Sequence, residues 1–331
     1  MNSKDMTISQ QFLSMATAKM VTKPMYVAAK LNIADHIEQG SNSIGALAKK
    51  TNAHESSLYR LMRALCSVGI FKERENKEFE LTPLAECLLD KPGSQRGMLM
   101  WFNDPIHDQA WEYLQYSVES GKPAFNKKFD KPIFDYFQNN KEISEVFNTA
   151  MTSNVKGVHG LIANAIDLSG AKCLYDIGGG HGHLVAQIME KNDHLKCGVF
   201  DIPHVVAGAS GKGEIAFEIF GGDFFEEIPA GADAHIMTFI LHDWDDNSCL
   251  KILENSHKAL EPGGKLYIGS NIIGAINEPS LGKLLDIEML VMTTGQERTE
   301  SEFKTLFERA GFTYQGAIDT KGPVSLLVAS K

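Results

Sequence analysis

From residue 172 onward, short apolar runs alternate with amphipathic segments that have helical spacing. The run CLYDIGGG ends in Asp176 and glycines, and later runs end at Asp201, Asp223 and His242. Strands that alternate with helices predict an α/β fold, a parallel, doubly wound sheet that is covered on both faces. Ligands of such sheets bind beyond the carboxyl ends of the strands. We therefore expect a functional site at this edge, where the acids, the glycines and the histidine would lie.

The preceding half of the chain predicts mainly helices. Residues 9–39 carry apolar side chains at helical spacing, and we expect Pro24 to break or kink that span. Two helices at 44–50 and 55–68, followed by a small hairpin, predict a winged-helix shape. The chain is thus expected to divide into a winged-helix-like domain at 1–95, a helical linker and substrate-pocket segment at 96–165, and a Rossmann-like domain at 166–331.

The charge balance argues against a nucleic-acid partner. Lys and Arg number 32 against 42 Asp and Glu, which gives the 331 residues a formal net charge of −10. Proteins that bind a phosphate backbone normally carry a basic surplus. The five cysteines form no C-x-x-C motif, and this pattern predicts a reduced, cytoplasmic protein. We expect no membrane partner, because the chain has neither a signal-peptide pattern nor a run of about 18 apolar residues.

The segment DIGGGHG forms the first predicted strand-to-helix turn. Its glycines allow the backbone to approach a ligand closely. Asp201 follows Gly178 by 23 residues, at the end of the next predicted strand, where a carboxylate can accept from both hydroxyls of a ribose. The dinucleotide fingerprint G-x-G-x-x-G would need a glycine at position 183, where this chain has His183. The pattern D-x-G-x-G-x-G instead matches the turn that class I methyltransferases use for S-adenosylmethionine.

Five longer motifs extend this match over most of the chain. They are DIGGGHG (176–182), FDIPHV (200–205), GGDFF (221–225), LHDWDD (241–246) and GQERT (295–299). With them the chain resembles the two-domain, metal-independent O-methyltransferases of the caffeate and hydroxyneurosporene type, which act on phenols or tailor polyketides. The resemblance implies a Rossmann-like class I methyltransferase domain, an N-terminal all-helical winged-helix dimerisation domain and therefore a homodimer.

The resemblance also implies a role for particular residues. His242 would be the general base, Glu297 the acid that orients it, and Asp243 their neighbour. No metal is expected, because His181 and His183 have no third ligand near them in the sequence. The cofactor S-adenosylmethionine would be bound by Asp176, Gly178, Gly180, Asp201, Asp223, Phe224 and Thr238, and the substrate by Phe147, Met151 and Asn154.

The predicted reaction suits these residue types. Methyl transfer to a phenol is an in-line displacement, and a phenol with a pKa of about 10 gains from a nearby base. The family usually has a second Glu at the end of the strand GKLYIGSN, but this chain has Ser270 there. Serine carries no charge, so we expect His242 to be supported by one matched acid, Glu297, and to be a weaker base than a histidine with two acids.

Two alternatives remain open at this point. The first is an enzyme of the same fold that binds S-adenosylmethionine but performs pericyclic or hydroxylation chemistry. The second is a DNA-binding regulator that uses the winged helix. The helix at 55–68 argues against DNA, because it has only two arginines and a broad apolar face. Such a face is better suited to packing between subunits than to a DNA groove.

Overall fold

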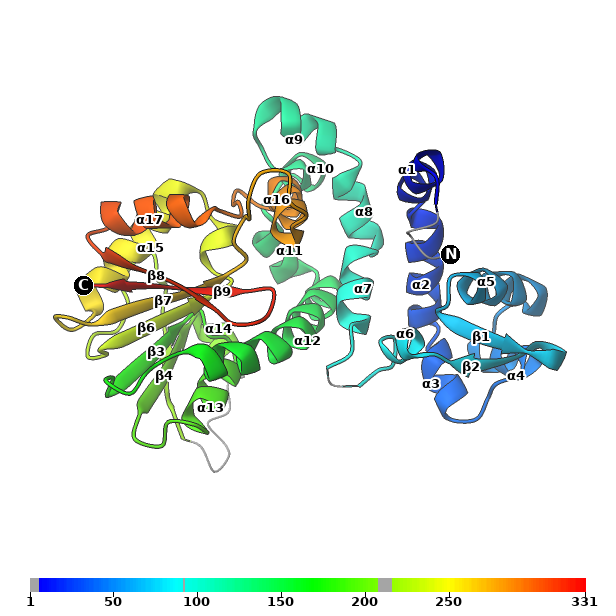
Figure 1. Ribbon diagram of the computed structural model, residues 1–331, viewed down its shortest axis with the longest axis horizontal. Helices are drawn as coiled ribbons and strands as arrows, with labels where there is room; N and C mark the ends of the chain where they lie inside the picture. Colours follow the sequence, from blue (N-terminus) through cyan, green and yellow to red (C-terminus); the bar gives the residue numbers. More distant parts are fainter. Residues whose placement is uncertain (1–5, 92, 208–215) are drawn as a thin grey trace. The chain divides into compact units, whose positions relative to one another are not determined.

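The computed structural model describes residues 6–91, 93–207 and 216–331, except for the side chains of 152–156. The chain forms two compact units (Figure 1): unit 1 comprises Met1–Gln109 and Phe137–Asn154, and unit 2 comprises Ala110–Tyr136 and Val155–Lys331. Domain boundaries at 95 and 165 stay a prediction. Three helices contribute residues to both units, namely α8 (Pro105–Trp111), α11 (Ile133–Asn139) and α12 (Lys141–Ala165).

Unit 1 is built around a helical core with a small hairpin. The Ser43 side chain accepts a hydrogen bond from the Ala46 N–H and so begins α4, and Gly69, with φ 81°, follows the end of α5. The elements are α1 (Ile8–Ala16), α2 (Lys19–Lys30), α3 (Ile33–Glu38), α4 (Ile44–Thr51), α5 (Glu55–Ser67), β1 (Phe71–Arg74), η2 (Glu75–Lys77), β2 (Glu78–Leu81), α6 (Pro83–Glu86) and α7 (Arg96–Phe102).

Unit 1 differs from the sequence prediction in two ways. It is not all-helical, because β1 and β2 pair in antiparallel fashion, with Phe71 opposite Leu81. This pair is the small hairpin expected after α5, and the winged-helix shape itself stays a prediction. The long helical span is interrupted at Thr17 and Ala18, whereas Pro24 lies inside α2 and does not break it.

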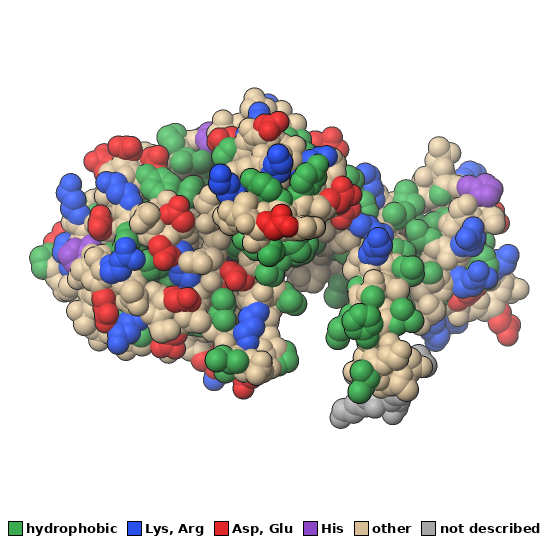
Figure 2. Space-filling model, turned by 90° about the horizontal axis from the view of Figure 1, so that it is seen from above, with side chains coloured by type: hydrophobic (Ala, Val, Ile, Leu, Met, Phe, Trp, Pro, Cys, Tyr) green, Lys and Arg blue, Asp and Glu red, His purple; other side chains and the backbone are tan. Residues whose placement is uncertain are grey.

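The N-terminal helices expose apolar side chains, some of the green surface at the right of Figure 2. Helix α1 has no buried residue. The exposed apolar side chains on α1 and α2 are Ile8, Phe12, Leu13, Met15, Met20 and Val27. Large contiguous apolar patches are rare on the surface of monomeric proteins and usually mark an interface.

Unit 2 contains a seven-stranded sheet with the order β5-β4-β3-β6-β7-β9-β8 (Figure 1). Its strands are β3 (Cys173–Ile177), β4 (Lys196–Asp201), β5 (Glu218–Gly221), β6 (Ala234–Thr238), β7 (Lys265–Ser270), β8 (Thr313–Asp319) and β9 (Ser325–Ser330). The helices are α9 (Leu114–Ser120), α10 (Ala124–Phe129), α13 (His183–Met189), α14 (Pro203–Val206), η3 (Leu241–Asp243), α15 (Asp246–Ala259), α16 (Leu281–Met292) and α17 (Glu300–Arg309).

The expected parallel sheet is antiparallel at one strand. Strand β9 runs antiparallel to both of its neighbours, β7 and β8, so the sheet is mixed. Strand β8 was not expected from the sequence at all. A short connection (320–324) joins β8 to β9, and a connection of this length allows only an antiparallel pair. The other strand pairs are parallel, as the alternation of strands and helices predicts.

Helices cover both faces of the sheet, as expected. On one face, residues of α15 and α17 such as Leu253 and Phe307 pack against Ile177 and Leu266. On the other face, α12 and α13 pack against the sheet in a second buried cluster that contains Ile162. Each fully buried aliphatic side chain contributes about 1.5–3 kcal/mol to folding. The two clusters fix β3, β4 and β6 side by side, so that their carboxyl ends share one edge.

No helix in the described part of the chain has both the length and the apolar character that a membrane crossing requires.

Candidate active site at the carboxyl edge of the sheet

The glycine turn after β3 is shaped by backbone conformations that favour glycine. Gly178, Gly180 and Gly182 have φ values of 74°, 58° and 80°. A Cβ added to Gly178 would lie 2.3 Å from the Cδ1 of Ile240, so the turn packs directly against the segment after β6. The Gly178 N–H donates to the Phe200 carbonyl at 2.7 Å, which ties the turn to β4.

Two carboxylates, Asp176 and Asp201, flank this turn. Asp201 accepts from the Gly180 N–H at 2.9 Å and from the Ile202 N–H at 2.7 Å. Burial raises the pKa of Asp201 above its ordinary value, although these hydrogen bonds oppose the rise. Asp176 is only 3% exposed, and burial together with the charge of Asp201 raises the pKa of Asp176 to about 7. The structure therefore brings the two predicted acids together.

The other predicted cofactor residues follow β5 and end β6. The Asp223 carboxylate accepts from the Phe225 N–H at 2.8 Å and so shapes its own turn. Phe224 packs edge-on against Trp244, with ring centroids 6.1 Å apart. The buried Thr238 hydroxyl has no hydrogen-bond partner among the residues that the structure describes. These positions agree with a site along the edge, while the contacts of Asp223, Phe224 and Thr238 with a cofactor stay a prediction.

His242 lies in η3, directly after β6, and binds the carboxylate of Glu297. The His242 Nδ1 and the Glu297 Oε1 are 2.9 Å apart, and the His242 side chain is 15% exposed. Asp243 lies on the other side of the ring, with its Oδ1 3.8 Å from Nε2. Because Nδ1–H donates to Glu297, the neutral ring keeps its lone pair on Nε2. This tautomer can accept a proton from a bound hydroxyl group.

Charges around His242 shift its pKa in opposite directions. Burial lowers the pKa of His242, but the carboxylates of Asp243 and Glu297 outweigh burial and hold it above the ordinary value. The guanidinium of Arg298 opposes the two carboxylates. Burial raises the pKa of Asp243, and the facing His242 counteracts that rise. The arrangement favours a histidine that gains a proton readily.

Glu297 is held in place by a hydrogen bond from its backbone to α16. Its N–H donates to the Asp286 carboxylate of α16 at 2.9 Å. One of its carboxylate oxygens, Oε2, is buried and has no hydrogen-bond partner within the described part of the chain. A Cβ at Gly295 would lie 1.9 Å from the His242 carbonyl oxygen. The segment 295–298 thus lies directly against the turn that carries the histidine.

Ser270 ends β7 and is 2% exposed. Its hydroxyl has no hydrogen-bond partner in residues 6–91, 93–207 and 216–331. Its neighbour Asn271 is also buried, and neither side chain carries charge. The sheet therefore brings no acid to this position, as the sequence shows.

The three predicted substrate residues belong to unit 1. Phe147 packs edge-on against Trp101, with ring centroids 5.1 Å apart, and Met151 is half-buried. The side chain of Asn154 lies outside the described residues. The structure thus brings together the predicted base and cofactor residues within unit 2, while contacts of Phe147, Met151 and Asn154 with a substrate stay a prediction.

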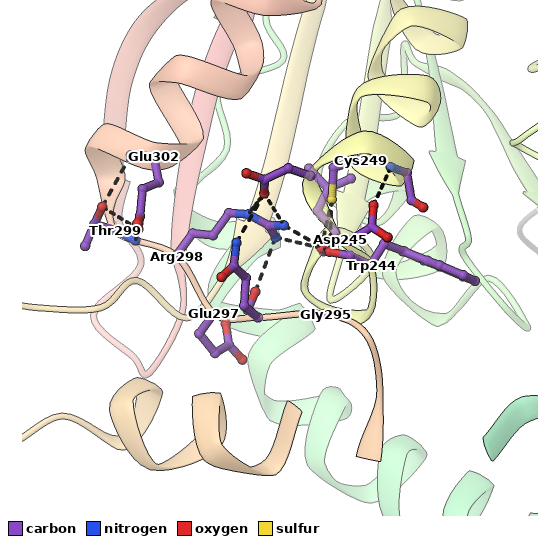
Figure 3. A network of polar contacts seen from close by, with 12 residues as sticks. Trp244, Asp245, Cys249, Gly295, Glu297, Arg298, Thr299 and Glu302 are labelled. Atoms are coloured by element: carbon purple, nitrogen blue, oxygen red, sulfur yellow. Dashed lines mark hydrogen bonds and ion pairs between the residues drawn. The ribbon is translucent and has the colours of Figure 1, made fainter. Parts of the chain in front are cut away.

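Two sets of contacts in unit 2 are not predicted by the sequence. Arg298 is 1% exposed, and its guanidinium lies at the centre of the polar network in Figure 3. The motif GQERT contains this arginine and could have drawn attention to it. The indole Nε1 of Trp111 donates to Glu288 of α16 at 2.8 Å, although the two residues are 177 positions apart. No sequence pattern of either segment points to that pair.

Comparisons with known proteins agree with this arrangement. Residues 111–313 match the family model of the O-methyltransferase domain, and residues 13–91 match that of the O-methyltransferase dimerisation domain. The chain is 37% identical to phenazine O-methyltransferase PhzM of Lysobacter antibioticus, over 97% of this chain and 96% of the relative. It is 34% identical to mitomycin biosynthesis 6-O-methyltransferase of Streptomyces lavendulae, over 92% of this chain and 89% of the relative.

A solved structure bears on the cofactor. Human N-acetylserotonin methyltransferase in complex with S-adenosylmethionine superposes with a TM-score of 0.90 at 27% identity, covering 100% of this chain and 99% of the human one. The residues present here are suited to that cofactor. Gly180 leaves open space where a side chain would stand, and the Asp201 carboxylate keeps lone pairs for further donors. From these matches and the geometry of the edge, the chain belongs to the O-methyltransferase family and is an S-adenosylmethionine-dependent methyltransferase.

Proposed function

We propose that this enzyme methylates a hydroxyl group of a small aromatic or polyketide-like metabolite, with His242 as the general base. The observation that carries the proposal is the 2.9 Å pair of His242 and Glu297. His242 follows β6, which lies next to β3 and its glycine turn in the sheet. The relatives support the substrate class, because they include a phenazine and a 3-amino-4-hydroxybenzoate methyltransferase.

The glycine turn and the acids around it would hold the cofactor. S-adenosylmethionine supplies an electrophilic methyl group on a positively charged sulfur. Gly178 and Gly180 admit the ligand to the backbone, and Asp201 accepts from the hydroxyls of its ribose. Asp176, whose carboxylate is buried at the end of β3, would also help to bind the cofactor. Asp223 and Phe224 lie at the adenine, and Thr238 offers its unpaired hydroxyl from the end of β6.

His242 would take the proton of the substrate hydroxyl on Nε2. Glu297 fixes the tautomer through Nδ1–H and stabilises the imidazolium that forms. A general base of this kind contributes about 10²–10⁴-fold to the rate. Alignment of two bound reactants supplies about 7–11 kcal/mol, so positioning exceeds the contribution of the base. Asp243 adds to the negative charge near the ring.

The uncharged Ser270 would make this base weaker than a histidine flanked by two glutamates. One carboxylate, Glu297, binds the ring directly, and the second position at the end of β7 has no charge. The enzyme would then depend more on positioning and would favour phenols whose hydroxyl is already acidic. Phe147, Met151 and Asn154 would contribute to the substrate pocket.

The enzyme would act as a cytoplasmic homodimer. The match of residues 13–91 to a dimerisation domain supports this, as do the apolar side chains that α1 and α2 expose. A second copy of the chain would cover these side chains. We propose no nucleic-acid and no membrane partner.

A mass assay tests the function. The purified protein is incubated with S-adenosylmethionine and a panel of phenols, and each product is examined for the mass of one added CH₂ group. Methylation that is lost in His242→Ala supports the proposal. If no phenol is methylated although the protein binds the cofactor, the enzyme performs the non-methylating chemistry of the alternative. A salt-dependent gel shift would identify a DNA-binding regulator.

A further inference from the structure

Arg298 is a buried cation with five hydrogen bonds, and most of them go to backbone rather than to an acid. Nη1 donates to the carbonyls of Leu241 and Gln296 at 2.9 and 3.2 Å. Nη2 donates to the carbonyl of Trp244 at 2.9 Å. Nε and Nη2 both donate to one oxygen of Asp246, at 3.1 and 2.8 Å. A planar guanidinium can bridge several acceptors at fixed angles, which a lysine cannot do.

The two carbonyls of Leu241 and Trp244 stand on either side of His242. Residue 241 precedes the histidine, and residue 244 follows it by two positions, so one guanidinium holds both ends of the turn. The turn itself has weak internal support. Its element η3 is only three residues long, and no side chain caps its N-terminus. Its last backbone hydrogen bond, from the Trp244 N–H to the Leu241 carbonyl, is 3.4 Å long.

The same arginine also fixes the chain that carries Glu297. Arg298 is the next residue, and its carbonyl accepts from the Ile273 N–H at 3.0 Å. Residues 272 and 298 form an isolated parallel bridge. The backbone of Arg298 is therefore tied to the segment after β7, while its side chain is tied to the histidine turn. Both partners of the His242–Glu297 hydrogen bond are held by one residue.

We propose that Arg298 is a positioning residue of the methyl transfer: by binding the carbonyls of Leu241 and Trp244, it holds His242 against Glu297 in the orientation that base catalysis needs. This inference rests on the proposed role of His242. Arg298 itself reaches no reacting atom. Cys249 assists, because its Sγ donates to the same Leu241 and Trp244 carbonyls at 3.1 and 3.4 Å.

The charge of Arg298 gives the proposal a signature that a purely structural role lacks. Asp243 and Glu297 raise the pKa of His242, and Arg298 lowers it. The other titratable groups around the guanidinium are Asp246 and Cys249 of α15 and Asp286 of α16. Asp246 and Asp286 are acids, and burial raises the pKa of Cys249 to about 12, which keeps the thiol neutral. Loss of the arginine therefore removes a cation that no other residue of this network replaces.

The test begins with Arg298→Met, which keeps a long apolar stem and removes the charge and the donors. We expect kcat for a phenol that the wild-type enzyme methylates to fall by about 10–10²-fold, a part of the usual general-base contribution. The KM for the phenol and the affinity for S-adenosylmethionine should change by no more than about twofold, because the lost contacts are not substrate contacts. The pKa of His242 should rise. NMR of the protein with ring-labelled histidine measures this pKa, and the His242→Ala variant identifies the signal of His242.

Two further variants separate position from charge. Arg298→Lys keeps the cation, so the His242 titration should stay near that of the wild type while kcat still falls. Asp246→Asn disturbs the same network but retains the guanidinium, so it should not raise the pKa of His242. If Arg298→Met does not fold, Arg298→Lys decides the question through its kcat.

Several outcomes would overturn the proposal. Arg298→Met with the wild-type kcat and an unmoved His242 titration would do so, as would a fully active Arg298→Lys. An equal rise of the His242 pKa in Asp246→Asn would show that loosening the network is enough to raise this pKa, whether or not the arginine is present. Failure of the proposed function looks different, because His242→Ala would then keep the full rate of methyl transfer.

Discussion

The backbone of Gly295 lies against the carbonyl of His242, and a Cβ at position 295 would lie 1.9 Å from that oxygen. The same Cβ would meet the backbone of Asp243 and Trp244 at 2.4 and 2.6 Å, so no flexible side chain could move aside. Only glycine allows the acid-bearing segment to approach the histidine turn this closely.

Gly295→Ala should therefore separate the two segments. We expect a loss of about 3 kcal/mol in the free energy of unfolding and at least about 10²-fold in kcat, because small displacements of a base are costly. Thermal unfolding and steady-state kinetics measure both. Gly274→Ala is the matched control, since a Cβ there meets nothing within 4 Å. Equal behaviour of the two variants would contradict the expected crowding.

Asp201 should contribute directly to cofactor affinity. Asp201→Ala removes an acceptor that binds the Gly180 N–H and faces the proposed ribose site. We expect weaker binding of S-adenosylmethionine by about 1.5–3 kcal/mol, the usual value for hydrogen bonds to a charged group. Calorimetry gives the affinity, and the exposed Asp193→Ala serves as control. Unchanged affinity in a folded Asp201→Ala protein would remove Asp201 from the site.

His242 should control the rate and its pH dependence. His242→Ala should lower methyl transfer by about 10²–10⁴-fold while cofactor affinity stays near normal, and Glu297→Gln should cost less. The base must be unprotonated, and its acidic neighbours raise the pKa of His242. The wild-type rate should therefore rise with pH through a midpoint above the ordinary histidine value of about 6.5.

Single-turnover kinetics are the measurement for this prediction, because they isolate the chemical step from product release. A His242→Ala enzyme with the wild-type single-turnover rate would place the base elsewhere, or would mean that positioning alone suffices.

Asp176 should make the free enzyme less stable as the pH rises. Its pKa moves from 3.8 to about 7 because burial, together with Asp201, disfavours the charged form. Between these two values the folded chain binds more protons than the unfolded chain, so stability falls with increasing pH. Asp176→Asn should remove this cost. The difference in the free energy of unfolding between the variant and the wild type should then be up to about 4 kcal/mol more favourable to the variant at pH 8 than at pH 4. Thermal unfolding of both proteins without cofactor, at several pH values, measures this difference. If the stability of the two proteins changes with pH in the same way, the prediction is contradicted.

The apolar surface of α1 should be an interface. We expect light scattering to show a dimer at micromolar concentration, with more than about 2,000 Å² buried between its subunits. Replacing Phe12 and Leu13 by Asp should weaken the dimer, because both side chains are exposed in a single chain. Val118→Asp, on α9 of unit 2, is the control. A wild-type mass of 36.5 kDa would reject the homodimer.

The edge of the sheet could be predicted from the sequence, because the residues that end each parallel strand are recognised from the apolar run directly before them. Asp176, Asp201 and His242 each end or follow an apolar run, and parallel pairing then brings the ends of β3, β4 and β6 to one edge. Glu297 is different. It lies 55 residues from His242 in the chain, and only the resemblance of GQERT to a known motif connected the two.

Other features were missed for physical reasons. Strand β8 has only half-buried and exposed residues, so its sequence lacks the apolar run that predicts a strand. Arg298 looks like a surface cation in the sequence, because nothing local shows that three carbonyls and an acid will surround it. The pair of Trp111 and Glu288 depends on how a helix far along the chain packs, and neither segment encodes that contact by itself.

The place of β9 between β7 and β8 has a consequence for folding. Strand β9 follows both neighbours in the chain, so the gap between them can be filled only after α16, α17 and β8 have been made. Until then β7, which is almost wholly buried in the finished sheet and includes Leu266 and Ile268, presents an open edge. Open apolar edges invite pairing with other chains. During synthesis from the N-terminus, the central sheet therefore keeps an edge open to aggregation until β9 emerges.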